Sequence, residues 1–283
     1  MISITPAEVK LFAEFIHARS GIVINSSKAY LLESRLGPLL DEYGAKSFAD
    51  FFYAGYRSEE WEARVVDAIS THETSFFRDQ RPFALLQTKI LPEFFVKRQN
   101  GSKTAPPELR IWSAACATGQ EVYSIAMIIA ELLGGAMKRW HITITGTDIS
   151  DVAIARARQG LYTRYEVERG VPLALCRKYF ESQGDLLKVR DDLQTMTVFY
   201  KTNLLTVAPE QFGRYDIILC RNVAIYFNQE NRRRLFQTIA SCLRSTGVLI
   251  IGSTESIVDA SDLFSRTESC NTTYFQKSAP QGV

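Results

Sequence analysis

Apolar residues recur at helical spacing through the first 70 residues of the chain. Val9, Phe12 and Ile16 open this pattern, behind a capping residue, Thr5, and a proline for the first helical turn. Further apolar stripes lie at 32–40, where Ser27 would cap the helix, at 48–52 and at 61–69. Four short helices with few β-branched runs predict a small all-α bundle.

The pattern changes at residue 109. Apolar runs typical of buried strands lie at 109–116, 141–150, 215–220 and 247–254, and helical patterns at 121–135, 151–160 and 232–247 alternate with them. A helix at 82–98, bent at Pro92, precedes the first strand, and 272–277 would be a short last strand. This alternation predicts an α/β fold with a parallel, doubly wound sheet. We therefore expect a helical domain at 1–72 and an α/β domain at 73–283.

Residues 160–202 interrupt the alternation. The stretch 189–200 has the pattern of hairpin strands inserted into the sheet order. We expect a small β-subdomain in this part of the chain.

Ligands of doubly wound sheets bind at the carboxyl ends of the strands. The first strand end, 113–121, is rich in Ala and Gly, so a ligand could approach the backbone closely just before a helix that carries Glu121 in its first turn. A tight strand-to-helix turn explains the same small residues. Asp148 closes the second strand, where it could accept hydrogen bonds from ribose hydroxyls or cap the next helix, a role open to Ser150 as well.

The third strand end carries a cation, a carboxamide and a phenol. Arg221 and Asn222 follow the apolar run 215–220, and Tyr226 lies one helical turn beyond Asn222. Such groups need partners when buried, so their presence here favours a functional site over a structural role.

The segment 71–79, Thr-His-Glu-Thr-Ser-Phe-Phe-Arg-Asp, joins the two expected domains. Linkers are ordinarily polar, yet this one carries two large apolar residues beside a cation. We expect Phe76 and Phe77 to anchor the segment in the core, so that Thr74 and Arg78, four residues apart on one helical turn, face the cleft. A purely structural linker accounts for the phenylalanines but leaves the arginine unexplained.

Composition narrows the classes of protein. The net charge of +2 is too small to indicate a nucleic-acid binder, although residues 1–75 are net acidic, with 7 Lys and Arg against 11 Asp and Glu. The five cysteines are widely spaced and odd in number, and the three histidines are scattered, which predicts reduced thiols and no metal site. The sequence shows neither a signal peptide nor a run of about 18 apolar residues, so we expect a cytoplasmic protein without direct membrane insertion.

Five segments resemble, in the same order, the signature segments of chemotaxis receptor methyltransferases, the CheR family. They are THETSFFRD at 71–79, WSAACATGQEVYSIAM at 112–127, TDIS at 147–150, NLL at 203–205 and CRNVAIYF at 220–227. The resemblance covers nearly the whole chain. It implies a Rossmann-like S-adenosylmethionine-dependent methyltransferase sheet, an inserted small β-subdomain at about 160–202, and an all-α N-terminal domain.

The resemblance also implies an activity. The methyl donor would be S-adenosylmethionine, with S-adenosylhomocysteine as product. The acceptor would be the side-chain carboxylate of specific glutamates on the cytoplasmic helical domain of chemoreceptors, whose methyl esters serve sensory adaptation. Arg78 and Tyr226 match the family's proposed catalytic pair. By position, the cofactor would be bound by His72, Thr74, Arg78, Glu121, Asp148, Asn203, Leu204, Arg221 and Asn222.

These residue types suit such a reaction. A glutamate is ionised at neutral pH and is already a nucleophile, so alignment of the carboxylate oxygen, the methyl group and the sulfur matters more than a strong base. A fixed arginine could hold one carboxylate oxygen, and a tyrosine hydroxyl could orient the other oxygen or the donor. The lack of a Ser/His/Asp or Cys/His arrangement is therefore expected.

Two features depart from the family pattern. His72 stands where the family often carries Asn, and residues 1–75 are net acidic where the family presents a basic face to the receptor. Lys28 and Arg35, about two helical turns apart, are the candidates for receptor contact, unless they are solvated surface charges. The loop within 181–192 is shorter than in members that dock on a receptor tail. We therefore expect recruitment to membrane receptor arrays without a tail peptide.

Two other functions stay open. A catalytically silent S-adenosylmethionine-binding sensor or scaffold would share the fold, although the presence of both Arg78 and Tyr226 favours an enzyme. A methyltransferase of nucleic-acid amines would often carry Asn-Pro-Pro-Tyr or Asp-Pro-Pro-Tyr at the third strand end, where this chain has CRNVAIY. The near-neutral net charge also disfavours nucleic acid as a partner.

Overall fold

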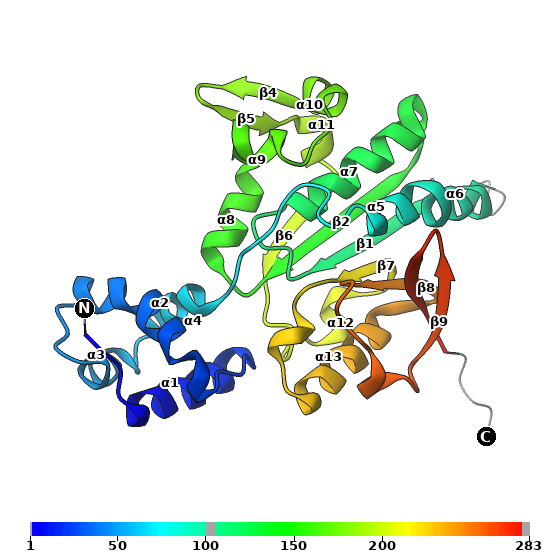
Figure 1. The fold of residues 1–283 in the computed structure, drawn as a ribbon. Helices are drawn as coiled ribbons and strands as arrows, with labels where there is room; N and C mark the ends of the chain where they lie inside the picture. Colours follow the sequence, from blue (N-terminus) through cyan, green and yellow to red (C-terminus); the bar gives the residue numbers. More distant parts are fainter. Residues whose placement is uncertain (1, 100–105, 279–283) are drawn as a thin grey trace.

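The computed structural model describes residues 2–99 and 106–278, and its first part is a bundle of helices (Figure 1). The bundle comprises α1 (Pro6–Ser20), α2 (Ala29–Glu42), α3 (Phe48–Gly55) and α4 (Glu59–Ile69), as the apolar spacing predicts. Phe12, Phe51 and Trp61 pack at its centre and are almost fully buried. Thr5 and Glu8 form a reciprocal capping box at the start of α1. We call residues 2–69 the helical lobe.

A seven-stranded sheet forms the centre of the second part, in the order β6-β2-β1-β7-β8-β10-β9. The strands are β1 (Glu108–Ala114), β2 (His141–Asp148), β6 (Thr197–Lys201), β7 (Tyr215–Cys220), β8 (Leu243–Ile251), β9 (Phe264–Ser269) and β10 (Thr272–Lys277). The first five in this order are parallel, and β10 runs antiparallel to β8 and β9. The expected doubly wound α/β class is confirmed. The strand order reverses between β1 and β7, where such sheets bind ligands.

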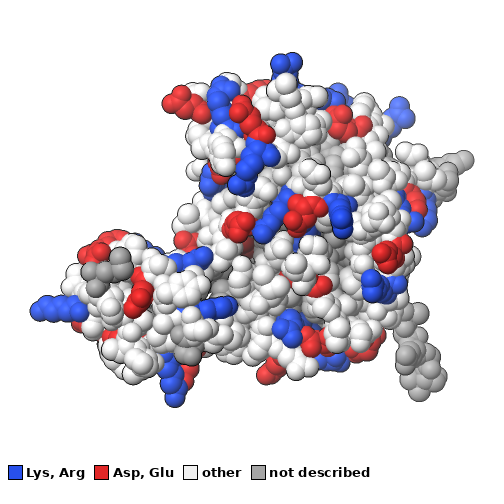
Figure 2. Space-filling view, viewed as in Figure 1, with Lys and Arg blue, Asp and Glu red and all other residues white. Residues whose placement is uncertain are grey.

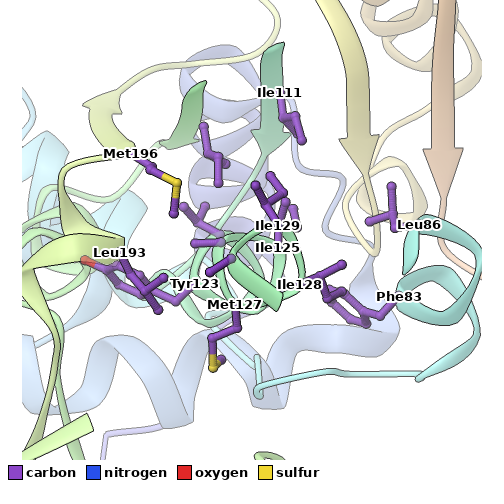
Figure 3. Packing of buried hydrophobic residues seen from close by; sticks show 14 of the residues in the cluster. Phe83, Leu86, Ile111, Tyr123, Ile125, Met127, Ile128, Ile129, Leu193 and Met196 are labelled. Carbon is purple, nitrogen blue, oxygen red and sulfur yellow. The ribbon is translucent and has the colours of Figure 1, made fainter. Parts of the chain in front are cut away.

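Helices cover this main sheet. They are α5 (Arg81–Leu85), the π-helical turn η2 (Leu86–Ile90), α6 (Leu91–Gln99), α7 (Gln120–Leu133), the 3₁₀ turn η3 (Gly134–Arg139), α8 (Asp151–Gln159), α12 (Pro209–Phe212) and α13 (Gln229–Cys242). Figure 3 shows apolar side chains of α7 between Phe83 and Leu86 on one side and Leu193 and Met196 on the other. This packing fixes α7, whose first turn faces the carboxyl ends of the strands.

Three details of the helices differ from the sequence prediction. The Ser27 hydroxyl donates to Asn25 Oδ1 within the 3₁₀ turn η1 (Ser26–Lys28), so Ser27 does not cap α2. The expected bend at Pro92 takes the form of the π-helical turn η2, because a proline ring clashes with the carbonyl four residues earlier. The helix expected to end at Gly247 ends at Cys242, because Leu243 already belongs to β8 and pairs with Tyr215 of β7.

A second, antiparallel sheet of three strands stands apart from the main sheet (Figure 1). It has the order β3-β5-β4, with β3 (Leu161–Thr163), β4 (Phe180–Gln183) and β5 (Leu186–Val189), and carries α9 (Arg164–Glu168), α10 (Leu173–Tyr179) and α11 (Asp191–Gln194). The expected inserted β-element is therefore present. The prediction of a hairpin at 189–200 is wrong. Val189 ends β5 of the small sheet, whereas β6 belongs to the main sheet and pairs parallel with β2 at its edge.

The helical lobe contacts the main sheet domain just beyond α1. Ile22 forms an antiparallel β-bridge with Phe227, and the Val23 N–H donates to the Tyr226 carbonyl at 2.9 Å. The Asn203 amide donates to the Arg19 carbonyl at 2.8 Å. The lobe thus meets the loops that follow β6 and β7, at the same end of the sheet as the carboxyl ends of the parallel strands.

Candidate active site

A cleft of about 1100 Å³, counting the solvent at its mouth, lies at the carboxyl ends of β1, β2 and β7. The ten residues that the sequence predicts for catalysis and cofactor binding all line it: His72, Thr74, Arg78, Glu121, Asp148, Asn203, Leu204, Arg221, Asn222 and Tyr226. They come from five segments that are distant in the sequence. The helical lobe adds Ser20 and Ile22, which sequence reasoning missed because neither carries a group with evident chemistry.

The loop after β1 contains three residues with positive φ, and all three are small. Ala115 and Ala117 have φ of 62° and 47°, and Gly119, the N-cap of α7, has φ of 94°. A Cβ on Gly119 would lie 2.9 Å from the Ala157 Cβ, which leaves no space for a side chain. The segment 113–121 is therefore a tight strand-to-helix turn, and the same segment forms a wall of the cleft.

Asp148 binds this loop with its buried carboxylate. Its Oδ2 accepts from the Ala117 N–H at 2.9 Å and its Oδ1 from the Ser150 N–H at 3.1 Å. Burial raises the pKa of the Asp148 carboxyl, although these two bonds and nearby His72 oppose the shift. The Ser150 hydroxyl caps α8 by accepting from the Ala153 N–H. The capping role that Asp148 could have served thus belongs to Ser150.

His72 faces Asp148 from the linker. Its Nε2 lies 3.9 Å from Asp148 Oδ1 and has no hydrogen-bond partner within the described part of the chain, although this atom is buried. A buried polar atom without a partner costs free energy, so a polar ligand group beside Asp148 would satisfy it.

Arg221 links the strand end to the linker. Its Nη1 donates to Glu121 Oε2 at 2.7 Å, and its Nη2 donates to Asp79 Oδ2 at 2.8 Å and to the Arg78 carbonyl at 2.9 Å. The second Glu121 oxygen accepts from the Ser113 hydroxyl. With 3% of its side chain exposed, Arg221 borders the cleft mainly as a cationic brace between β7, α7 and the linker.

The linker is a turn and not the expected helix. Phe77 and Asp79 have φ of 52° and 64°, so Thr74 and Arg78 do not lie one helical turn apart. The reason is tertiary, because Arg221 holds Asp79 and the Phe77 N–H donates to the Ser124 hydroxyl. Both Thr74 and Arg78 nevertheless line the cleft.

Phe76 anchors the linker. Its ring is 1% exposed and packs edge-on against Tyr162 and Phe180 of the small sheet, with centroids 4.9 and 5.5 Å away. Phe77 is half-buried and packs against Phe83 at 5.4 Å. The sequence prediction that both phenylalanines anchor this segment is confirmed.

The Arg78 and Tyr226 side chains remain accessible in the cleft. Arg78 is 30% exposed, and its guanidinium donates to the Glu73 carbonyl. Tyr226 is half-buried in the 3₁₀ turn η4 (Ala224–Tyr226), and its hydroxyl has no hydrogen bond to any of the described residues. A cation and a phenol therefore border one cleft with donors available to a ligand.

The turn that carries Asn222 and Tyr226 is held by Glu255, which sequence reasoning missed. The Glu255 carboxylate accepts four backbone N–H groups, from Asn222, Val223, Ala224 and Gly252. The signal was present in the sequence, because Gly-Ser-Thr-Glu at 252–255 follows β8 at the same edge of the sheet.

Lys28 and Arg35 lie on the helical lobe and do not themselves line the cleft, although Arg35 contacts Ser70 and Thr71, which do. Lys28 is exposed, whereas the Arg35 guanidinium donates to the Ile69 and Ser70 carbonyls at 2.9 Å each and so caps the end of α4. Figure 2 shows basic and acidic side chains interspersed over the visible face of this lobe.

Within 2–99 and 106–278, no group of three or more His, Cys, Asp or Glu side chains could hold a metal ion. Among the helices in the same ranges, none is long and apolar enough to cross a membrane.

The doubly wound sheet has its cleft at the switch point, where such folds bind a ligand, and comparison with known proteins identifies the class of protein. Residues 72–273 match the family described as "CheR methyltransferase, SAM binding domain", and residues 7–63 match "CheR methyltransferase, all-alpha domain". The chain belongs to the CheR methyltransferase family.

Relatives in this family share most of the chain. The chemotaxis protein methyltransferase of Vibrio parahaemolyticus is 36% identical over 95% of this chain and 96% of that protein. Chemotaxis protein methyltransferase 1 of Pseudomonas aeruginosa is 34% identical over 92% and 94%. The chemotaxis protein methyltransferase of Escherichia coli is 31% identical over 90% and 86%. The protein is thus a methyltransferase of chemotaxis that uses S-adenosylmethionine.

Proposed function

We propose that this protein transfers a methyl group to the side-chain carboxylate of specific glutamates on chemoreceptors and so forms glutamate methyl esters. The observation that supports this reaction best is the presence of Arg78 and Tyr226 in one cleft with Asp148 and His72. A cation and a phenol suit a carboxylate acceptor, and the acidic end of the cleft suits a cofactor with hydroxyl groups.

The residues of the cleft fit S-adenosylmethionine. The Asp148 carboxylate would accept hydrogen bonds from ribose hydroxyls, and the His72 Nε2, which lacks a partner among the described residues, would gain one there. The backbone at Ala115 and Ala117 allows close approach of a ligand. We assign Thr74, Arg78 and Glu121 to the methionine end of the cofactor, and Asn203, Leu204, Arg221 and Asn222 to the remaining walls.

The protein's own contribution to the reaction would be alignment. S-adenosylmethionine supplies a methyl group on a positively charged sulfur, which a carboxylate attacks directly. The Arg78 guanidinium would hold one oxygen of the acceptor, and the Tyr226 hydroxyl would orient the other. A glutamate is already ionised at neutral pH, so the cleft needs no strong general base.

The partner would be the cytoplasmic helical domain of chemoreceptors, which makes the protein a cytoplasmic one recruited to membrane receptor arrays. Lys28 is the better placed of the two candidate contacts, because it is exposed, whereas Arg35 already binds carbonyls of the lobe. A tail peptide is not required in this proposal, since only Gly184 and Asp185 join β4 to β5. Receptors truncated before their C-terminal tail should be methylated as fast as intact ones.

The decisive experiment is transfer of radiolabelled methyl groups from S-adenosylmethionine to membranes that contain chemoreceptors. Base treatment should release the label as volatile methanol, as an ester requires. Base-stable label would mean N- or C-methylation and would overturn the proposed acceptor. Cofactor binding without any transfer would favour a silent sensor or scaffold.

A further inference from the structure

Glu255 lies behind the turn that borders the cleft. It follows β8 by four residues, whereas the turn 222–226 follows β7, so these two segments are neighbours only because β7 and β8 pair. Glu255 lines a second groove, together with Asp79, Arg81 and Ser253, on the other side of this turn.

The contacts of Glu255 are all to backbone donors. Oε2 accepts from the Asn222 N–H at 2.7 Å and the Gly252 N–H at 2.8 Å. Oε1 accepts from the Val223 N–H at 2.9 Å and the Ala224 N–H at 2.8 Å. Charge-assisted hydrogen bonds of this kind are shorter and stronger than neutral ones, so one carboxylate fixes three consecutive residues of the turn.

The backbone of this turn needs an external partner. Asn222 has φ of 60°, in the left-handed region, which asparagine adopts more readily than most residues but only as a single residue within a turn. The three N–H groups at 222–224 point to one place, and the η4 turn that follows carries Tyr226. Without an acceptor at that place, the turn would lose the contacts that define its conformation.

Gly252 leaves room for the carboxylate. A Cβ on Gly252 would lie 2.6 Å from Glu255 Oε2 and 3.1 Å from the Asn222 nitrogen. Any larger residue at 252 would therefore displace the carboxylate while leaving the charge in the protein.

We propose that Glu255 is a positioning residue, whose carboxylate holds the turn 222–226 and thereby sets Asn222 and Tyr226 in the cleft. The role of Tyr226 in this proposal rests on the proposed function, whereas the effect on Asn222 concerns the cofactor alone. Glu255 touches neither cofactor nor acceptor in this account and acts through the four N–H donors.

Three variants test the proposal in the full-length protein. Glu255→Ala removes the acceptor. Glu255→Gln replaces one oxygen by an amide NH₂ group, which faces N–H donors and cannot accept from them. Gly252→Ala keeps the carboxylate and pushes it away from Asn222. Glu268→Gln is the matched control, because Glu268 is exposed on β9 and, among the described residues, its carboxylate forms an ion pair with Arg266 alone, at 3.8 Å.

We expect methyl transfer to receptor membranes to fall about a hundredfold in Glu255→Ala, with KM for the receptor unchanged, because displacement of an aligning group by about 1 Å has that effect. Gly252→Ala should fall similarly, and Glu255→Gln about tenfold. Binding of S-adenosylhomocysteine, measured by calorimetry, should weaken in the same order. Glu268→Gln should match the wild type in both measurements.

Rescue separates positioning from a general loss of structure. Formate can enter from the groove that Glu255 lines and occupy the place of the missing carboxylate, so it should restore much of the Glu255→Ala activity, whereas chloride at equal ionic strength should not. A variant that merely unfolds would not respond to formate.

The outcomes are distinguishable from failure of the proposed function. If the wild type itself transfers no methyl to receptors, the proposed acceptor is wrong, and the calorimetry still tests Glu255. If all three variants bind S-adenosylhomocysteine and transfer methyl groups within twofold of the wild type, Glu255 does not position the turn. Should Glu255→Ala fail to fold, Glu255→Gln and Gly252→Ala decide by the same criteria.

Discussion

The backbone N–H of Val23 donates a 2.9 Å hydrogen bond to the carbonyl oxygen of Tyr226. This bond joins the end of the helical lobe to the turn that borders the cleft, and the neighbouring bridge between Ile22 and Phe227 extends the contact. Ser20 and Ile22 line the same cleft as Tyr226. The lobe is therefore part of the active-site wall, and its docking should influence both stability and methyl transfer.

Substitution of Gly21 tests this docking. Gly21 has φ of 76°, and a Cβ there would lie 2.1 Å from Leu205 Cδ1 across the contact between the lobe and the sheet domain. Gly21→Ala should lower the free energy of unfolding by about 1–3 kcal/mol in urea titrations and should reduce methyl transfer. Gly135→Ala is the control, because Gly135 lies in η3 with no other atom within 4 Å of an added Cβ. That change should be neutral or stabilising by up to about 1 kcal/mol. Equal unfolding of the two variants would contradict the prediction.

Asp148→Asn should weaken binding of S-adenosylhomocysteine by about tenfold or more, because a neutral amide accepts weaker hydrogen bonds than a carboxylate. Calorimetry measures this directly. Asp151→Asn, at the exposed start of α8, is the control and should leave affinity unchanged. Unaltered affinity in Asp148→Asn would show that Asp148 does not bind the cofactor and that its role is limited to the hydrogen bonds with Ala117 and Ser150.

The same variant should alter the pH dependence of stability. Burial raises the Asp148 pKa above its ordinary value of 3.8, so the folded protein binds a proton more tightly at this site than the unfolded chain does. The contribution of Asp148 to stability is therefore fully present below 3.8 and is lost as pH rises through the folded pKa. Urea unfolding of the wild type and of Asp148→Asn, compared from acid to neutral pH, should show the wild type losing stability relative to the variant. A constant difference would contradict the raised pKa.

Arg78→Ala should reduce methyl transfer by about two to three orders of magnitude, as loss of a hydrogen-bond donor at the reacting centre does elsewhere. Affinity for S-adenosylhomocysteine should fall much less, since Asp148 and the loop after β1 remain. Arg81→Ala is the matched control, because Arg81 lies three residues away and lines the other groove. Normal turnover in Arg78→Ala would show that Arg78 has no catalytic role.

Arg221→Ala should lower the free energy of unfolding by about 3 kcal/mol, because it leaves the half-buried Glu121 carboxylate, which is 13% exposed, without its cation. We take the lower end of the range for broken buried pairs, since Asp79 is 37% exposed and can be solvated. Arg266→Ala removes an exposed pair with Glu268 and should cost about 0.5 kcal/mol at most. Urea titration of both variants provides the comparison, and similar losses would show that Arg221 is not a brace.

Much of the fold follows from local patterns. The helical lobe was predictable from apolar residues at helical spacing, and β1, β2, β7 and β8 from short apolar runs. The strand β6 was not, because 189–200 resembles a local hairpin, and only pairing with β2 across the sheet decides otherwise. Likewise, the turn in the linker depends on Arg221, which lies 142 residues beyond Asp79.

The sequence by itself determined the class of fold, the strand ends that carry polar groups and the family resemblance of the five segments, because each depends on residues close together in the chain. Only the tertiary structure decided that Arg221 braces the linker, that Ser150 rather than Asp148 caps α8, and that Glu255 holds the turn with Tyr226. These facts depend on which strands lie side by side and which donors are already satisfied. Neither is set by local spacing, because both arise when the sheet and the helical lobe come together.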